Sequence, residues 1–184
     1  MAIVRLKTDR LLLREVQPND TEEIFECRFQ DKDVSQYMWW EASTDIADAQ
    51  QFIDFELKNV ENKKWNRWLI IPERSEKIIG TCLLYFNEDE GHWDISYNLG
   101  KEYQGFGYAT EAMKAVLRYA VGVRNIDVVY TTFAAENQRF GNVLKKLGFE
   151  FVKEVPYVCN GGKTLTTGVF CEFEPKMVRT GDLL

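Results

Sequence analysis

The chain has 184 residues, and 23 lysine and arginine side chains against 29 aspartate and glutamate side chains give a formal charge of −6. With 45% hydrophobic and 28% charged residues, the composition is that of a soluble globular protein and excludes disordered and collagen-like chains. The acidic balance argues against direct nucleic-acid binding, which usually needs a basic surface, and it is compatible with a cationic partner.

Hydrophobic periodicity and turn residues divide the first half of the chain into one strand, two helices and three strands. Apolar residues at steps of three and four predict the helices, and the second helix follows a capping cluster at Ser43–Asp45. Apolar, aromatic and alternating runs bounded by turn residues predict the strands. The predicted elements are a strand at 10–16, helices at 21–30 and 46–60, and strands at 65–71, 77–86 and 92–99.

The second half opens with a glycine-rich segment at 100–108 and contains the clearest helix of the chain. From Ala109 to Val121, apolar residues recur at the spacing of one helix face. Gly148 ends a second helix, and Asn160–Gly162 is typical of a hairpin turn. The remaining predicted elements are a strand at 127–133, a helix at 137–147, and strands at 149–158 and 163–173.

This order of elements predicts an α/β (α+β) fold. Hairpins early and late in the chain, with two crossover helices between them, imply a mixed and mostly antiparallel sheet of six to seven strands that about four helices cover. The chain shows no linker or low-complexity tract, so we expect one domain at 1–175 and a frayed tail at 176–184.

Cysteine and histidine usage argues against a metal or disulfide protein. The four cysteines are far apart without a CxxC pair, and a single histidine cannot complete a zinc set, so no metal is expected. Apolar pieces within residues 1–14 are short and broken by charges, so neither a secretion signal nor a membrane span is expected. We therefore predict a cytoplasmic protein with reduced, packed cysteines that makes no membrane contact and is a monomer or homodimer.

The most informative segment joins the strand at 92–99 to the helix that begins near Ala109. It contains Gly105 and Gly107, which let the backbone approach a ligand because they have no Cβ. A helix start leaves N–H groups unpaired and is partially positive, so a pyrophosphate fits there; a plain turn is the alternative. The dinucleotide fingerprint would need glycine at Thr110, and the P-loop ending is absent.

The same loop resembles motif A of the GNAT (GCN5-related N-acetyltransferase) superfamily, whose pattern is Gln/Arg-x-x-Gly-x-Gly/Ala. Gln104, Gly107 and Ala109 occupy its three fixed positions. The chain is similar in particular to the branch that acetylates the N-terminal amines of ribosomal proteins. The further segments that match this branch, in order, are Thr8–Arg14, Ile78–Gly80, Asp94–Leu99, Ala109–Ala112 and Glu136–Phe149.

This resemblance implies acetyl-CoA as the cofactor and a sheet with a central splay. In the family, the motif A amides hold the pyrophosphate, and the strand before the loop pairs with the pantetheine arm. Lys145 or Lys146 is either a partner of the adenosine phosphate or part of a solvated helix face. The implied cofactor-binding residues are Tyr97, Asn98, Leu99, Gln104, Gly105, Phe106, Gly107, Tyr108, Ala109, Thr110, Asn137 and Phe140.

For catalysis, the resemblance implies direct attack of a primary amine on the thioester in a ternary complex. Asp94 matches a strand position where family members often have Glu, so it is the candidate general base, acting through a water because Asp is shorter. The alternative for Asp94 is a solvent-facing carboxylate. The backbone amide near Leu99 is the expected donor to the thioester oxygen.

Two familiar proton donors of the family are missing. Leu144 stands where many members have Tyr, and Phe140 stands where the N-terminal-amine branch has Ser. Either another group such as Tyr157 serves, or the thiolate leaves unaided, which a thiol pKa of about 8.5 permits. The remaining alternatives are an acyl-CoA-binding or sensory domain with lost or weak catalysis and an unrelated nucleotide-binding α/β enzyme.

The acceptor is predicted to be a primary amine, either a peptide N-terminus or a small cationic molecule, in keeping with the acidic charge. Four large side chains lie between the first two helices, which wall the acceptor site in the family. From these, Tyr37, Trp39 and Trp40 are the candidate substrate-binding residues; they either contact a cation or, for the two tryptophans, fill the core.

Overall fold

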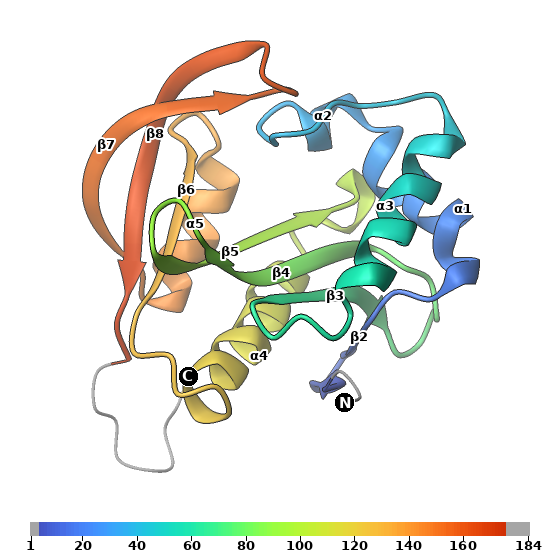
Figure 1. The fold of residues 1–184 in the computed structure, drawn as a ribbon, viewed down its shortest axis with the longest axis horizontal. Coiled ribbons are helices and arrows are strands. Elements are labelled where there is room, and N and C mark those ends of the chain that lie inside the picture. Colours follow the sequence, from blue (N-terminus) through green and yellow to red (C-terminus); the bar gives the residue numbers. More distant parts are fainter. Residues whose placement is uncertain (1–3, 176–184) are drawn as a thin grey trace.

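The computed structural model describes residues 4–175, which form one mixed sheet with helices on both faces (Figure 1). The strand order is β1-β2-β3-β4-β5-β6-β8-β7, and the strands run antiparallel to their neighbours except for β5 and β6. The strands are β1 (Leu6–Lys7), β2 (Leu11–Arg14), β3 (Trp65–Pro72), β4 (Gly80–Asn87), β5 (His92–Leu99), β6 (Val129–Ala134), β7 (Glu150–Cys159) and β8 (Thr164–Phe173). The helices are α1 (Thr21–Ile24), α2 (Lys32–Ser35), α3 (Ile46–Asn59), α4 (Tyr108–Gly122) and α5 (Gln138–Leu147).

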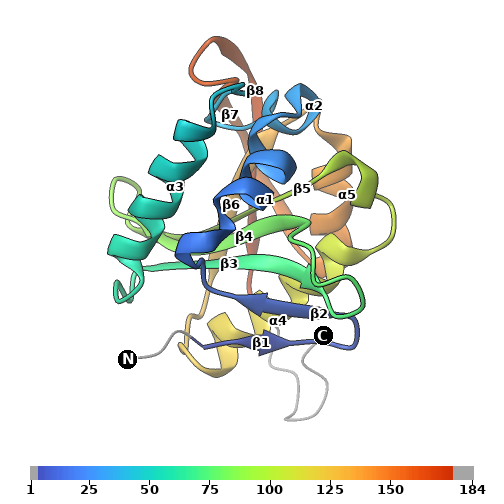
Figure 2. The same cartoon turned by 90° about the vertical axis from the view of Figure 1, so that its right-hand side faces the viewer.

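Two hydrophobic clusters fill the two faces of the sheet. One contains Trp68 and Ile70 and packs against α4 and α5, whereas the other contains Leu69 and packs against α1 and α3. Successive residues of a strand point to opposite faces, which explains why neighbours in β3 enter different clusters. Figure 2 shows α1 in front of the middle of the sheet, near β4, with β2 and β1 below it.

The predicted fold class is confirmed, with differences in detail. The sheet has eight strands rather than six to seven because the two-residue strand β1 is too short to leave a pattern. The single turn α2, capped by the carboxylate of Asp31, was likewise not predicted. The strand predicted at 77–86 begins only at Gly80, since the Ile78 N–H donates to the Glu23 carboxylate at 2.8 Å.

The helix predicted at 21–30 is present, but its second half is wider than an α-helix. A π-helical turn, Phe25–Phe29, continues α1, and the Gln30 N–H bonds to the Phe25 carbonyl. Such turns are rare and occur often at functional sites. Here three consecutive residues, Cys27, Arg28 and Phe29, are all buried.

The parallel strands β5 and β6 separate soon after they meet (Figure 1). Their ladder consists of Trp93 opposite Val129 and Asp94 opposite Tyr130. Beyond it, the Thr131 hydroxyl donates to the Ile95 carbonyl at 2.9 Å. The remainder of β5 stays paired with β4 alone, which agrees with the expected central splay.

The hairpin of β7 and β8 forms the far side of the sheet, and β7 is the edge strand. The register of this pair shifts between Phe151 and Lys153, and Pro156 lies within β7. At the hairpin tip, Lys163 forms an ion pair of 2.7 Å with Glu41, in the segment that follows α2. The hairpin therefore reaches over the sheet to the helices of the opposite end.

The cysteines behave as predicted: all four are free and buried. Burial raises the pKa of the Cys27 and Cys82 thiols to about 12, so both are protonated at neutral pH. Among the described residues, no helix has the length and apolar character that crossing a membrane requires. The predicted tail at 176–184 lies outside the described residues.

Candidate active site

The glycine loop after β5 has the geometry of an anion cradle. Gly105 and Gly107 have φ values of +88° and +83°, in the left-handed region that glycine adopts without strain. Gly107 caps α4, and the first helical bond runs from the Glu111 N–H to the Gly107 carbonyl. The amides of Tyr108, Ala109 and Thr110 therefore have no acceptor within the helix, and an anion can take this place.

The turn before β2 holds this loop from outside. The Arg10 guanidinium donates to the Phe106 carbonyl at 3.0 Å and lies 4.7 Å from the centre of the Tyr108 ring. Thr8 donates its hydroxyl to the Glu111 carboxylate at 2.6 Å. Glu111 is in the first turn of α4, so the N-terminal segment fixes the helix start that carries the free amides.

Arg139 places a cation at the loop, and it was not among the residues predicted for the site. Its Nη1 donates to Gln104 Oε1 at 2.6 Å, and Gln104 Nε2 donates to the Leu99 carbonyl at 3.1 Å. Arg139 is exposed and lies two residues after Asn137, a position in the first turn of α5 that could have marked it. Lys145 and Lys146 are exposed in the last turn of that helix.

The edge of β5 beyond Asp94 presents backbone groups toward the gap between β5 and β6. The Ile95 carbonyl accepts from Thr131, and the Leu99 carbonyl accepts from Gln104. Backbone groups of a strand alternate between its two sides, so Tyr97 shares the orientation of Ile95 and Leu99. An extended ligand has backbone partners along this edge at Tyr97 and Leu99.

Phe140 and Asn137 are at the start of α5, next to this gap. The Asn137 side chain caps the helix by accepting from the Phe140 N–H at 3.2 Å. The Phe140 ring stacks on Tyr97 with a centroid distance of 4.7 Å and also packs against Phe133. Burial raises the pKa of the Tyr97 hydroxyl, so this aromatic group is neutral.

Asp94 lies where β5 and β6 part, and it is 8% exposed. Burial raises the pKa of its carboxyl group, while the nearby His92, whose Nε2 lies 3.9 Å from Asp94 Oδ2, opposes the shift. A carboxylate with a raised pKa is a better proton acceptor than an ordinary surface Asp. Asp94 is therefore a buried group rather than the solvent-facing one of the alternative interpretation.

Tyr157 approaches the same region from β7. Burial raises the pKa of its hydroxyl to about 12, with smaller contributions from Cys159 and Asp94. The hydroxyl donates to the Tyr37 carbonyl at 3.0 Å. Tyr157 thus ties β7 to the segment after α2.

A buried hydrogen-bonded chain crosses the face of the sheet that α1 and α3 cover. Arg67 forms an ion pair of 2.9 Å with Glu56 and donates to the Thr81 hydroxyl at 3.3 Å. The Trp65 indole also donates to Glu56, at 2.8 Å. Thr81 in turn donates to Asn98 Oδ1 at 2.7 Å, which connects the chain to β5.

Arg28 joins this chain from the π-helical turn. It is 2% exposed, and its Nη1 donates to Asn98 Oδ1 at 3.1 Å. Its guanidinium lies 4.1 Å from the centre of the Trp40 ring and 4.6 Å from that of Phe52. Burial and the nearby charge of Arg67 lower the Arg28 pKa well below its ordinary value. The sequence shows no signal for this role, because it depends on distant partners.

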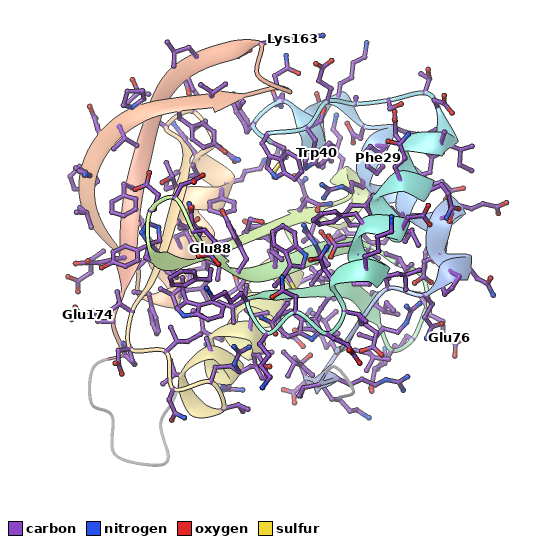
Figure 3. The ribbon with its side chains drawn as sticks, in the orientation of Figure 1. Phe29, Trp40, Glu76, Glu88, Lys163 and Glu174 are labelled. Atoms are coloured by element: carbon purple, nitrogen blue, oxygen red, sulfur yellow. The ribbon has the colours of Figure 1, made fainter. Side chains whose placement is uncertain are left out.

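The three aromatic candidates for acceptor binding have different environments. Trp40 is buried next to Phe29 and covers the protein's own cation, Arg28 (Figure 3). Trp39 is 66% exposed, and Tyr37 is half-buried. A cleft of about 620 Å³ opens between the π-helical turn and the loop after β5. Its lining includes Cys27, Gly100 and Tyr103.

Comparisons with known proteins agree on one family. Residues 10–150 match the model of the acetyltransferase (GNAT) domain. An uncharacterized N-acetyltransferase, p20, of Bacillus licheniformis is 28% identical over 147 residues, which are 79% of this chain and 82% of that protein. A GNAT-family acetyltransferase of Bacillus anthracis superposes with a TM-score of 0.80 at 22% identity, over 93% of this chain and 98% of that one. RimL, a ribosomal L7/L12 α-N-protein acetyltransferase solved with coenzyme A, superposes with a TM-score of 0.81 at 14% identity, over 93% and 98% of the two chains.

Proposed function

The chain belongs to the GNAT family of acetyltransferases, and we propose that it transfers acetyl from acetyl-CoA to a primary amine by direct attack in a ternary complex. One observation carries the proposal most: the unpaired edge of β5 runs directly into the loop of Gly105 and Gly107. An extended ligand with a pyrophosphate at one end matches this combination of an open strand edge and an anion cradle.

The cofactor-binding residues of the proposal are those of the loop and of β5. The amides of Tyr108 to Thr110 and the Arg139 guanidinium bind the pyrophosphate. Tyr97 and Leu99 pair with the pantetheine arm through their backbones, and Asn137 and Phe140 border it. When bound, acetyl-CoA supplies the activated acetyl thioester.

Asp94 is the general base of the proposal and receives the proton of the amine through a water. The Leu99 amide donates to the oxygen on which negative charge develops. We assign no general acid, because an ordinary thiol with a pKa of about 8.5 is a tolerable leaving group near neutrality. Tyr157 has a structural role here, since its hydroxyl is directed at Tyr37.

The experiment measures thiol release from acetyl-CoA with a panel of peptide N-terminal amines and small amines, and identifies acetylated products by mass spectrometry. We expect turnover with at least one primary amine and a loss of about 10²-fold in Asp94→Asn, the size typical of a general base. An unchanged pH profile in Asp94→Asn would remove Asp94 from this role. Coenzyme A binding without turnover on any amine would favour the sensory alternative.

A further inference from the structure

Two buried donors on the acceptor side of β5 have no partner. Among the described residues, Arg28 Nε and Asn98 Nδ2 are buried nitrogen atoms without a hydrogen-bond acceptor. They belong to side chains that already touch, because Arg28 Nη1 donates to Asn98 Oδ1 at 3.1 Å. Buried donors are rarely left unpaired, since each costs the free energy of its desolvation. Two such donors on side chains that touch each other are compatible with a ligand oxygen.

The orientation of the Asn98 amide follows from its neighbours. Arg67 donates to the Thr81 hydroxyl, and this hydroxyl donates to Asn98 Oδ1. Arg28 has only N–H donors, so it too requires an oxygen at that position. The nitrogen of Asn98 is therefore the atom left over, since exchanging the two amide atoms would place a donor against the Arg28 donor and break that bond.

The charge of the network selects the kind of oxygen. Two guanidinium groups, Arg28 and Arg67, are buried with one carboxylate, Glu56, as the hydrogen-bonded anion of the chain. The rings of Trp40 and Phe52 cover the Arg28 guanidinium. Its hydrogen-bond partner is the neutral amide of Asn98 rather than a carboxylate. Because Glu56 pairs with Arg67, Arg28 is the cation left for a ligand, and a singly charged carboxylate fits it better than a doubly charged phosphate.

We propose that Arg28 and Asn98 bind a carboxylate of the acceptor, so that the acceptor carries both a primary amine and a carboxylate. This inference rests on the proposed acetyl transfer and narrows its acceptor to amino-acid-like molecules.

The strand sets the separation between the two groups of the acceptor. Asp94, Ser96 and Asn98 share one face of β5, at intervals of about 7 Å. An amine above Ser96 is then within reach of a water on Asp94, while the carboxylate points toward Asn98. This arrangement fits a few carbon atoms between the amine and the carboxylate.

Matched pairs of acceptors test the inference on the wild-type enzyme. Glycine, β-alanine and γ-aminobutyrate are each compared with their carboxamides, with kcat/KM expressed per concentration of free amine. We expect at least one carboxylate acceptor to exceed its carboxamide at least tenfold. Equal or better use of the carboxamide at every spacing would overturn the inference, while acetylation of any amine would leave the proposed function intact.

Short peptides distinguish the source of the carboxylate. Peptides with Glu or Gln at the second position present the same N-terminal amine with and without a carboxylate. The ratio of kcat/KM for the Glu peptide to that for the Gln peptide is compared with the acid-to-carboxamide ratio of each free amino acid. If the peptide ratio is the larger, the carboxylate belongs to a peptide side chain. Failure of all amines, with or without a carboxylate, would instead contradict the proposed function.

Arg28→Gln identifies the binding group. We expect the ratio of kcat/KM for the preferred carboxylate acceptor to that for its carboxamide to fall to about one. Arg124→Gln is the matched control, because Arg124 also lies over an aromatic ring, Trp93, and bonds to an asparagine, Asn66. A ratio that stays at the wild-type value in Arg28→Gln overturns the assignment. If Arg28→Gln does not fold, ligand binding to the wild-type complex with coenzyme A tests the assignment instead. We expect this complex to bind the acid and not its carboxamide, and equal binding of the two would overturn the assignment.

Discussion

Arg10 binds Glu111 at two points, from its backbone nitrogen to Oε1 at 2.9 Å and from its Nε to Oε2 at 2.6 Å. Because Glu111 is in the first turn of α4, these bonds connect the start of β2 with the glycine loop. The same guanidinium also holds the Phe106 carbonyl. Arg10 is therefore a positioning residue for the proposed pyrophosphate site, although it need not touch the cofactor.

Arg10→Ala is expected to weaken cofactor binding more than it weakens the fold. The loop loses its outer support, and we expect the dissociation constant for coenzyme A to rise about tenfold, equivalent to about 1.4 kcal/mol. Isothermal titration measures this change. Lys7→Ala is the control, since it removes the exposed ion pair with Glu73 and leaves the loop untouched. Equal affinity in wild type and Arg10→Ala would contradict the positioning role.

Gly107→Ala is expected to combine backbone strain with loss of cofactor affinity. At a φ of +83°, a side chain costs about 1–2 kcal/mol, and the new Cβ lies 3.4 Å from Arg10 Nη2. Gly91→Ala carries a similar strain, because Gly91 has a φ of +72° in the β4–β5 hairpin. Both variants lose stability in thermal melting, and Gly107→Ala alone loses affinity for coenzyme A. Similar affinities in the two variants would refute the assignment of the loop.

Asp94→Asn is expected to stabilise the protein at neutral pH. Burial raises the Asp94 pKa above its ordinary 3.8, so the folded state holds this proton longer than the unfolded state does. The free energy of unfolding that Asp94 contributes therefore falls as pH rises between the two pKa values. Asp94→Asn has no such pH-dependent loss of stability. The amount by which its melting temperature exceeds that of the wild type therefore grows from pH 4 to pH 7. Asp89→Asn, at an exposed position, is the control, and a constant advantage of Asp94→Asn across this pH range would contradict the burial argument.

Glu56→Gln is expected to destabilise the fold strongly. It removes the carboxylate between Trp65 and Arg67 and leaves two guanidinium groups inside the protein. Breaking one side of a buried pair costs about 3–5 kcal/mol, and urea unfolding measures this loss. Glu88→Gln is the control, because the Lys64–Glu88 pair is exposed and its loss leaves the midpoint nearly unchanged. Similar urea midpoints for Glu56→Gln and Glu88→Gln would mean that burial of the two arginines does not need Glu56.

Local patterns predicted the elements that border the proposed cofactor site. The alternation of His92–Leu99 marks β5 at both ends, and Asn137 and Gly148 mark the two ends of α5. The π-helical turn and Arg28 could not be predicted in this way. A charged residue in a helix is usually exposed, and the burial of Arg28 depends on Asn98, seventy residues away in the sequence. The proposed acceptor side depends on such distant contacts more than the proposed cofactor side does.

The shift of register between Phe151 and Lys153 affects how copies of the protein meet. β7 is an edge strand with exposed Phe151 and Val158, and a regular edge of this kind invites strand addition and aggregation. The bulge disturbs the outer row of hydrogen-bonding groups, and Pro156 removes one N–H from the strand. This edge is therefore a poor template for another β-strand, which protects the concentrated protein from edge-to-edge assembly.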